Sequence, residues 1–374
     1  MLPRAPALLL LLAALVGCSA AARLAVNGMD LTYNGEKVFL IGSSLAYNNY
    51  GNDFGNGADS TTLETWVQEI SEAGGNSVRV FTHADGYSTP AFDDLGYVTA
   101  CDLTGDFESD ILHFLDVAQE NNLLVTLVMW NGWSTNQIGM GLILEDDKLD
   151  SYIENCLNSL ITTIKGHPAL AAFESVTEPE ASFLIEASVE PCYDTTMLGN
   201  NGGGWMGNNI PIERYLNFIA RQNAAVRAID PETLITVGAW NQFSASDAFS
   251  NTRNYYKDEC LVLASGSEGS VLDFYQLHTL SLEGHWTENA PFTVDAEDYL
   301  LDKPLVLGSF SSVCSENNTL GELFTYAYEH GYSGGWSWQY SADDDCSDTP
   351  ETQQQYLSVL EGRTDHGTVD IVVG

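Results

Sequence analysis

An apolar run that ends in two closely spaced carboxylates decides the fold, and it occupies residues 170–180, which read LAAFESVTEPE. Near-continuous hydrophobicity of this kind is typical of a parallel strand that is buried on both faces. A second run of the same type, KPLVLGSFSS at residues 303–312, ends at Ser309. In barrels of parallel strands the chemistry lies at the carboxyl ends of the strands, so Glu178 and Ser309 are candidate site positions.

Short apolar runs of this type recur along the chain, and amphipathic stretches separate most of them. The eight runs are Val38–Leu45, Ser77–Thr82, Leu123–Trp130, Leu170–Val176, Leu234–Trp240, Leu272–Leu277, Pro304–Phe310 and Gly335–Gln339. The predicted helices are Thr62–Ala73, Phe107–Glu120, Lys148–Lys165, Ile212–Ile229, Thr319–Glu329 and Thr352–Leu360. This alternation predicts an α/β protein with a (β/α)8 TIM barrel rather than an open sheet.

The segments around the predicted barrel are less regular. A small N-terminal β-hairpin is predicted at residues 24–33, where Asn27-Gly28 and the following Asn34-Gly35 are strong turn dipeptides. The connections around residues 241–270 and 281–303 are weakly periodic and are predicted to be long loops with little helix. The glycine-rich stretch 199–205 predicts a flexible insertion after the fourth strand. No linker interrupts residues 23–374, which we interpret as one domain.

Residues 1–22 have the features of a secretory signal peptide. Arg4 supplies the basic start, Leu8–Val16 the apolar segment and Gly17–Ala22 the small residues of a cleavage region. The apolar segment is too short to span a bilayer, and no later segment is long and apolar enough. We therefore predict a secreted, extracellular protein with no membrane contact. The alternative is a bacterial lipoprotein signal, which the sequence before Cys18 also resembles.

Six cysteines follow the signal segment: Cys101, Cys156, Cys192, Cys260, Cys314 and Cys346. An even number in an oxidising compartment predicts up to three disulfides, and six cysteines allow fifteen pairings. We favour Cys314 with Cys346, because both follow neighbouring predicted strands. The spacing contains no CxxC pair or Cys/His cluster of the zinc type, and no metal or other cofactor is predicted.

The chain is strongly acidic. It has 52 Asp and Glu against 13 Lys and Arg, which gives a formal net charge of -39. This charge argues against nucleic acid and anionic membranes as partners. We interpret it as a solvated acidic surface. The alternative is weak, multivalent contact with calcium or a calcium mineral, although no EF-hand loop or long acidic run supports that idea.

Aromatic and polar side chains gather at the predicted carboxyl ends of the strands and in the insertion. They are Arg79, His83, Trp130, Trp133, Thr177, Glu178, Trp205, Trp240, His278, Ser309, Trp336 and Trp338. Several tryptophans around one mouth are suited to stacking on sugars, because the C–H faces of pyranose rings are apolar. The alternative for each tryptophan is that it only fills the core.

These motifs resemble those of glycoside hydrolase family 5. Thr177-Glu178-Pro179 is similar to the Asn-Glu-Pro motif on the fourth strand of that family, and the sequences NSVRVFTH (76–83), DFYQLH (273–278), KPLVLGSF (303–310) and GWSW (335–338) resemble its strands two, six, seven and eight. Residues 50–57 and 203–207 are similar to secreted endo-β-1,4-mannanases of molluscs and other invertebrates. The resemblance covers essentially the whole mature chain and implies β-1,4-mannan or a related polysaccharide as the partner.

The resemblance also implies a role for each matching residue. Glu178 would be the general acid/base of a retaining hydrolase. Arg79 would orient the nucleophilic carboxylate and hold it ionised, and His278 would hydrogen-bond near the acid/base or the leaving sugar. The sugar-binding residues would be His83, Trp130, Trp133, Trp205, Trp240, Trp336 and Trp338.

Three positions depart from the family pattern. Ser309 stands where the family has its nucleophilic Glu, Leu280 where it has Tyr, and Thr177 where it has Asn. Retention requires two carboxyl groups roughly 5–5.5 Å apart, and serine cannot replace one of them. A serine hydrolase is disfavoured, because Ser309 lies in no GxSxG nucleophile elbow. Glu268, Glu283 and Glu316 are the substitute carboxylates nearby in the sequence.

The sequence therefore predicts a mannanase-like barrel that binds β-mannan or a related glycan, with hydrolysis weak or absent. One alternative is an active endo-β-1,4-mannanase that uses another carboxylate or an external anion. The other is an acidic extracellular or mineral-associated matrix protein that reuses the barrel as a scaffold.

Overall fold

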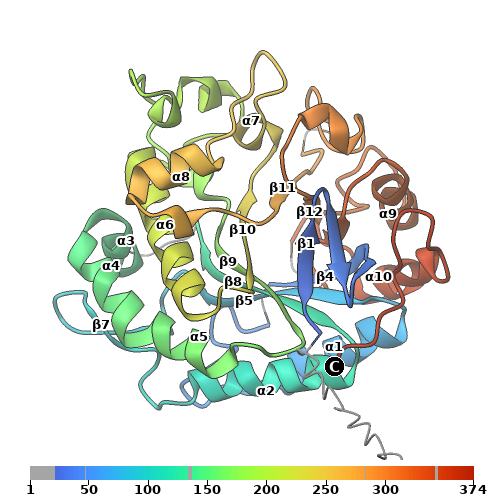
Figure 1. The fold of residues 1–374 in the computed structure, drawn as a ribbon, viewed down its shortest axis with the longest axis horizontal. Coiled ribbons are helices and arrows are strands. Elements are labelled where there is room, and N and C mark those ends of the chain that lie inside the picture. Colours follow the sequence, from blue (N-terminus) through green and yellow to red (C-terminus); the bar gives the residue numbers. More distant parts are fainter. Residues whose placement is uncertain (1–21, 47, 134–136, 283, 342–343) are drawn as a thin grey trace, which may run out of the picture.

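Eight parallel strands close into a barrel in the computed structural model, in the circular order β4-β5-β8-β9-β10-β11-β12-β13 (Figure 1). The structure describes residues 22–46, 48–133, 137–282, 284–341 and 344–374. The predicted signal segment lies outside the described residues except for Ala22, and Glu283 lies outside them as well. Each strand pairs in parallel with its neighbours, which confirms the predicted (β/α)8 barrel.

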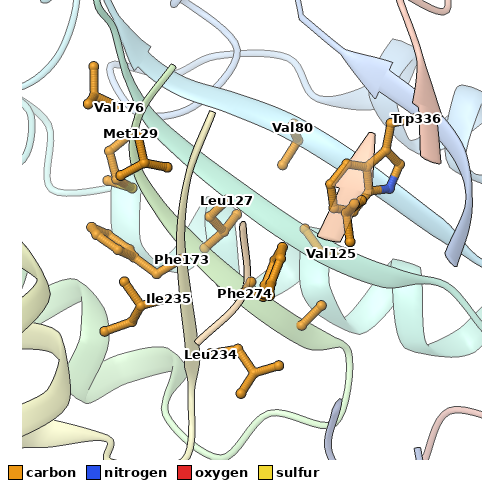
Figure 2. Packing of buried hydrophobic residues seen from close by; sticks show 14 of the residues in the cluster. Val80, Val125, Leu127, Met129, Phe173, Val176, Leu234, Ile235, Phe274 and Trp336 are labelled. Atoms are coloured by element: carbon orange, nitrogen blue, oxygen red, sulfur yellow. The ribbon is translucent and has the colours of Figure 1, made fainter. Parts of the chain in front are cut away.

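The barrel strands fall close to the eight predicted runs. They are β4 (Leu40–Leu45), β5 (Ser77–Ala84), β8 (Leu124–Asn131), β9 (Leu170–Thr177), β10 (Leu234–Ala239), β11 (Tyr275–His278), β12 (Leu305–Phe310) and β13 (Gly334–Ser337). The runs are continuously apolar because both faces are buried, one in the barrel interior and one beneath the helices. Leu127, Phe173 and Ile235 are partners across β8, β9 and β10, and all three are fully buried (Figure 2).

The helices surround the barrel in Figure 1. They are α1 (Thr61–Glu72), α2 (Phe107–Glu120), α3 (Gln137–Leu144), α4 (Asp146–Tyr152), α5 (Asn158–Ile164), α6 (Ile212–Ile229), α7 (Gln242–Ala245), α8 (Asp258–Ser265), α9 (Leu320–Glu329) and α10 (Pro350–Tyr356). The predicted helix Lys148–Lys165 corresponds to α4 and α5, which a π-helical turn at Ile153–Leu157 joins. Among the described residues no helix is long and apolar enough to cross a membrane.

The connections contain more regular structure than the sequence predicts. The prediction of little helix at residues 241–270 is wrong for α8, because that segment buries Cys260 and Leu261 against the rest of the fold. A short antiparallel ribbon, β6 (Ala91–Phe92) with β7 (Val98–Ala100), was not predicted. Strands of two and three residues carry too few side chains to show a period.

The predicted N-terminal hairpin is present and gains a third strand. It consists of β1 (Leu24–Asn27), β2 (Asp30–Tyr33) and β3 (Glu36–Lys37). Asn34 and Gly35 both have positive φ, 54° and 79°, as the tight turn between β2 and β3 requires. Arg23, just before β1, pairs with Asp230 at 2.8 Å, close to the start of β10. The hairpin therefore lies at the amino ends of the strands and leaves the carboxyl ends free for a site.

Three disulfides link the six cysteines as Cys101–Cys156, Cys192–Cys260 and Cys314–Cys346. The third confirms the pairing that we favoured. It joins the segments that follow β12 and β13, which are neighbours in the barrel. This bond therefore fixes two connections at the carboxyl end of the barrel.

Candidate active site

Glu178 directly follows β9 and has an unusual backbone conformation. Its φ and ψ are 50° and 49°, in the left-handed region that residues other than glycine adopt infrequently. The strain is held from both sides, since Glu178 N donates to Gly238 O at 2.6 Å and Pro179 opens a 3-10 turn that runs to Ser182. Strained backbone of this kind is concentrated at functional sites.

His278, the last residue of β11, holds the carboxylate of Glu178. Its Nδ1 lies 2.6 Å from Glu178 Oε1, and the two side chains are 1% and 15% exposed. The other ring nitrogen, His278 Nε2, is buried and has no hydrogen-bond partner. His278 was predicted near Glu178 and lies within hydrogen-bond distance of it, while the acid/base role of Glu178 stays a prediction.

Ser309 lies on β12 directly opposite His278. Its carbonyl oxygen accepts a hydrogen bond from Thr279 N at 2.8 Å, so its backbone is held in the sheet. Its hydroxyl is buried and has no hydrogen-bond partner. Since His278 Nε2 also lacks a partner, the two residues form no Ser–His hydrogen bond, which an activated serine nucleophile would need.

Glu178 and Ser309 border a cavity of about 350 Å³ at the carboxyl end of the barrel. Its lining is mainly aromatic and apolar, and the ends of β9 and β12 contribute the polar side chains of Thr177, Glu178 and Ser309. The lining residues are Phe81, Trp133, Thr177, Glu178, Trp205, Trp240, Leu280, Leu282, Ser309, Trp338, Asp344, Asp345 and Cys346. The three positions predicted to depart from the family pattern, at 177, 280 and 309, therefore lie in one cavity.

Three of the expected sugar-binding residues are buried elsewhere. His83 stacks on Phe107 at 4.7 Å, and burial lowers its pKa to about 3. Trp130 is 1% exposed and packs edge-on against Tyr152. The register of β5 against β8 shifts between Phe81, which lines the cavity, and Ala84, so His83 lies within an irregular part of the strand.

Trp336 is also in the core rather than at the cavity. It is fully buried, and its indole N–H donates to the hydroxyl of Ser77 at 3.0 Å. Ser77 is the first residue of β5, so Trp336 fills the barrel well below the carboxyl ends of the strands, among the hydrophobic side chains of Figure 2. Trp338, two residues further along the chain, lines the cavity.

Arg79 is fully buried and pairs with a residue that the sequence analysis did not consider. Its Nε and Nη2 donate to the two carboxylate oxygens of Glu174 at 2.7 and 2.5 Å, and Nη2 also donates to Thr177 Oγ1 at 2.7 Å. Gln276 donates to Glu174 at 2.9 Å. A Cβ at Gly238 would lie 2.4 Å from Glu174 Oε1, so only glycine leaves room for this network. The sequence could have revealed Glu174, because it is a charged residue within an apolar strand and a buried charge requires a partner.

Two further carboxylates, Asp344 and Asp345, lie at the cavity and were also missed. Asp344 accepts hydrogen bonds from Trp338 Nε1 at 2.8 Å and from the backbone N of Cys346 at 2.9 Å. The substitutes considered from the sequence lie elsewhere: Glu268 is on an exposed turn before β11, at the amino ends of the strands, and Glu316 does not line the cavity. Within the described ranges, no cluster of three or more His, Cys, Asp or Glu is arranged to hold a metal ion.

The fold and the site together define a class of protein. A (β/α)8 barrel whose fourth strand presents a glutamate beside a histidine, in a tryptophan-lined cavity, is the architecture of a glycoside hydrolase.

Comparison with known proteins makes this class specific, although no family model matches the chain. The chain is 39% identical to a mannan endo-1,4-β-mannosidase of Cryptopygus antarcticus over 347 residues, and this match covers 91% of each protein. It is 38% identical to a mannan endo-1,4-β-mannosidase of Mytilus edulis over 368 residues, and this match covers 96% of this chain and 98% of that one. An endo-1,4-β-mannanase structure from Eisenia fetida superposes with a TM-score of 0.92 at 40% identity, over 94% of this chain and 99% of that one. The chain therefore belongs to the mannan endo-1,4-β-mannosidase family, in glycoside hydrolase family 5.

Proposed function

We propose that this protein is a secreted member of the mannanase family that binds β-1,4-mannan or a related glycan and has lost ordinary retaining hydrolysis. The observation that carries the proposal is Ser309, which lies in the cavity wall on the strand next to His278. A retaining site needs a nucleophilic carboxylate about 5–5.5 Å from the acid/base. A serine hydroxyl without a base cannot attack the anomeric carbon or stabilise positive charge there.

Binding is supported by the groups that remain. Trp133, Trp205, Trp240 and Trp338 line the cavity, where their faces can stack on sugar rings. The relatives act on mannan according to their names, which favours a mannan chain as the ligand of this cavity. Export is supported by the signal segment and by the three disulfides, since such bonds persist in oxidising compartments.

The buried pair of Arg79 and Glu174 explains how the fold tolerates serine at position 309. In a site with a nucleophilic carboxylate, Arg79 could help to balance that charge. In this chain the guanidinium is neutralised by Glu174, through two hydrogen bonds within the barrel. The positive charge of Arg79 therefore keeps a counter-charge when position 309 is a serine, although its Nη1 is buried without a hydrogen-bond partner among the described residues.

The test measures binding and hydrolysis separately on the mature, disulfide-bonded protein. We expect saturable binding of mannohexaose by calorimetry, and release of reducing ends from galactomannan at least about 1,000-fold slower than by Ser309→Glu. Ser309→Gln, which matches the length of glutamate without its charge, should stay inactive. Glu178→Gln in the Ser309→Glu background should abolish the recovered activity. Absence of saturable binding, or hydrolysis by the wild type within tenfold of Ser309→Glu, would overturn the proposal.

A second candidate function is hydrolysis through Asp344 or Asp345, which is favoured because both line the cavity with Glu178. An inverting site places its two carboxyl groups about 6.5–9.5 Å apart, with a water between them. If the wild type releases reducing ends and Asp344→Asn or Asp345→Asn abolishes this release, the second candidate replaces the first.

A further inference from the structure

Trp205 and Trp240 form a two-tryptophan wall at one side of the cavity. Their ring centroids are 4.8 Å apart and the planes are tilted by 49°. Both residues line the cavity, yet they come from different segments: Trp205 from the insertion after β9, and Trp240 from the end of β10. Trp205 is 44% exposed, so packing alone does not fix it. A wall built in this way needs an anchor that both segments share.

The carboxylate of Glu180 anchors Trp240. Glu180 lies two residues after the acid/base, is 1% exposed and does not line the cavity. Its Oε2 accepts a hydrogen bond from the backbone N of Trp240 at 3.2 Å, and its Oε1 accepts one from the hydroxyl of Tyr256 at 2.6 Å. Burial raises the pKa of this carboxyl to about 7, because the ionised form loses its hydration in the protein interior.

The backbone of the same residue anchors the segment that carries Trp205. Glu180 O accepts a hydrogen bond from Gly204 N at 2.9 Å, and Ala181 O accepts one from Met206 N at 2.9 Å. These two bonds hold the residues on either side of Trp205. The insertion also fits closely against Trp240, since a Cβ at Gly202 would lie 2.4 Å from its indole nitrogen. The insertion predicted to be flexible is thus tied to Glu180 and to the end of β10.

We propose that Glu180 is the positioning residue of the two-tryptophan wall, and that the affinity of the cavity for a glycan depends on it although it does not touch the glycan. Its side chain fixes Trp240 and its peptide carbonyl fixes the segment that carries Trp205. The role of the glycan as ligand rests on the function proposed above. The arrangement of the wall itself does not, and it can be measured without ligand.

Two substitutions separate positioning from general stability. Glu180→Leu removes the hydrogen bonds of the carboxylate to Trp240 and Tyr256 at similar volume. Glu180→Gln can restore both, because its amide oxygen accepts from Trp240 N while its amide nitrogen donates to the Tyr256 hydroxyl, which can accept. A matched control is Asp230→Asn, which weakens a buried carboxylate contact with Arg23 at the amino ends of the strands.

The first measurement is the affinity for mannohexaose by calorimetry. We expect Glu180→Leu to weaken binding about tenfold, which is the size of effect expected when one well-packed aromatic contact is lost. Glu180→Gln should recover most of that affinity. Asp230→Asn should lower the melting temperature without changing the affinity. In a Trp240→Ala background, Glu180→Leu should have little further effect, because the anchor has nothing left to position. Equal affinity of Glu180→Leu and the wild type would overturn the proposal.

The second measurement is circular dichroism of the protein without ligand. Closely spaced indoles couple, and the difference between the wild type and Trp205→Phe isolates the signal of this pair. Glu180→Leu should lose that signal and Glu180→Gln should keep it. If Glu180→Leu does not fold, Tyr256→Phe, which removes one of the two hydrogen bonds, takes its place and should reduce the signal. An unchanged signal in the variant refutes the positioning role. If the signal of the variant changes but the wild type binds no mannohexaose, only the proposed function is refuted.

Discussion

His278 and Ser309 are direct partners on the adjacent strands β11 and β12, yet their side chains form no hydrogen bond. His278 Nδ1 instead lies 2.6 Å from Glu178 Oε1. Glu178 is thus held by a residue that forms no hydrogen bond with the side chain at position 309. A substitution at position 309 is therefore expected to leave the pair of His278 and Glu178 in place, and single variants can test this.

The first prediction concerns Leu280, which lines the cavity with Ser309. Leu280→Tyr alone should not raise the rate of galactomannan hydrolysis. In the Ser309→Glu background it should raise that rate about tenfold or more, because the tyrosine hydroxyl can donate to the new carboxylate. Initial rates of reducing-end release measure the effect. Leu280→Phe in the same background is the control for ring packing. If it matches Leu280→Tyr, the hydroxyl has no role.

The second prediction concerns the buried ion pair of Arg79 and Glu174. Glu174→Gln should lower the free energy of unfolding by about 3–5 kcal/mol, because it leaves the guanidinium charge buried without a counter-charge. The double variant Arg79→Met/Glu174→Met should be less destabilised than Glu174→Gln. Urea unfolding measures both. Asp146→Asn, at an exposed pair with Arg214, is the control and should cost about 1 kcal/mol or less. A similar loss at both sites would contradict the assigned role of burial.

The third prediction is a pH dependence of stability that arises from Glu180. Its pKa in the fold, about 7, lies above the ordinary value of 4.5, so the folded state binds a proton more tightly than the unfolded state. This contribution to stability is complete below about pH 4.5 and is lost as the pH rises to about 7. The loss corresponds to roughly 3 kcal/mol. Tyr256, the titratable group in contact with it, has a pKa well above 10 and stays neutral in this range.

Urea unfolding of the wild type and Glu180→Gln between about pH 4.5 and pH 8 measures this contribution. The glutamine variant lacks the titration, so the wild type should lose roughly 3 kcal/mol relative to it as the pH rises. Other groups titrate equally in both proteins and cancel in the comparison. Parallel stability curves for the two proteins would refute the assignment.

The fourth prediction concerns the disulfide of Cys314 and Cys346. Cys346 lines the cavity, and its backbone N donates to Asp344, which in turn accepts from the indole of Trp338. Replacing both cysteines by serine should cost about 2–4 kcal/mol of stability. It should also weaken mannohexaose binding, because the segment that holds Trp338 is released. Cys101 and Cys156, bonded away from the cavity lining, provide the control pair, whose removal should lower stability but leave the affinity unchanged.

Much of the barrel was predictable, because parallel strands buried on both faces leave continuous apolar runs such as residues 170–176. The short helix α8 was missed, since its eight residues lie within a long connection of weak periodicity. His83 and Trp130 were expected at the cavity because they follow the same strand ends as true lining residues. His83 lies within a register shift near the end of β5, and such an irregularity leaves no mark in the sequence. Trp130, on β8, packs against Tyr152 and Phe218, contacts that only the folded chain brings together.

The sequence by itself determined the order of the strands, most of the residues near their carboxyl ends and the presence of serine, leucine and threonine at positions 309, 280 and 177. These follow from hydrophobic periodicity and residue identity, which are local properties of the chain. Only the tertiary structure decided that these three positions share one cavity, that Arg79 pairs with Glu174, and that Glu180 anchors Trp240. Those relationships join residues that lie far apart in the chain or depend on small irregularities of the strands, so they arise only when the barrel closes.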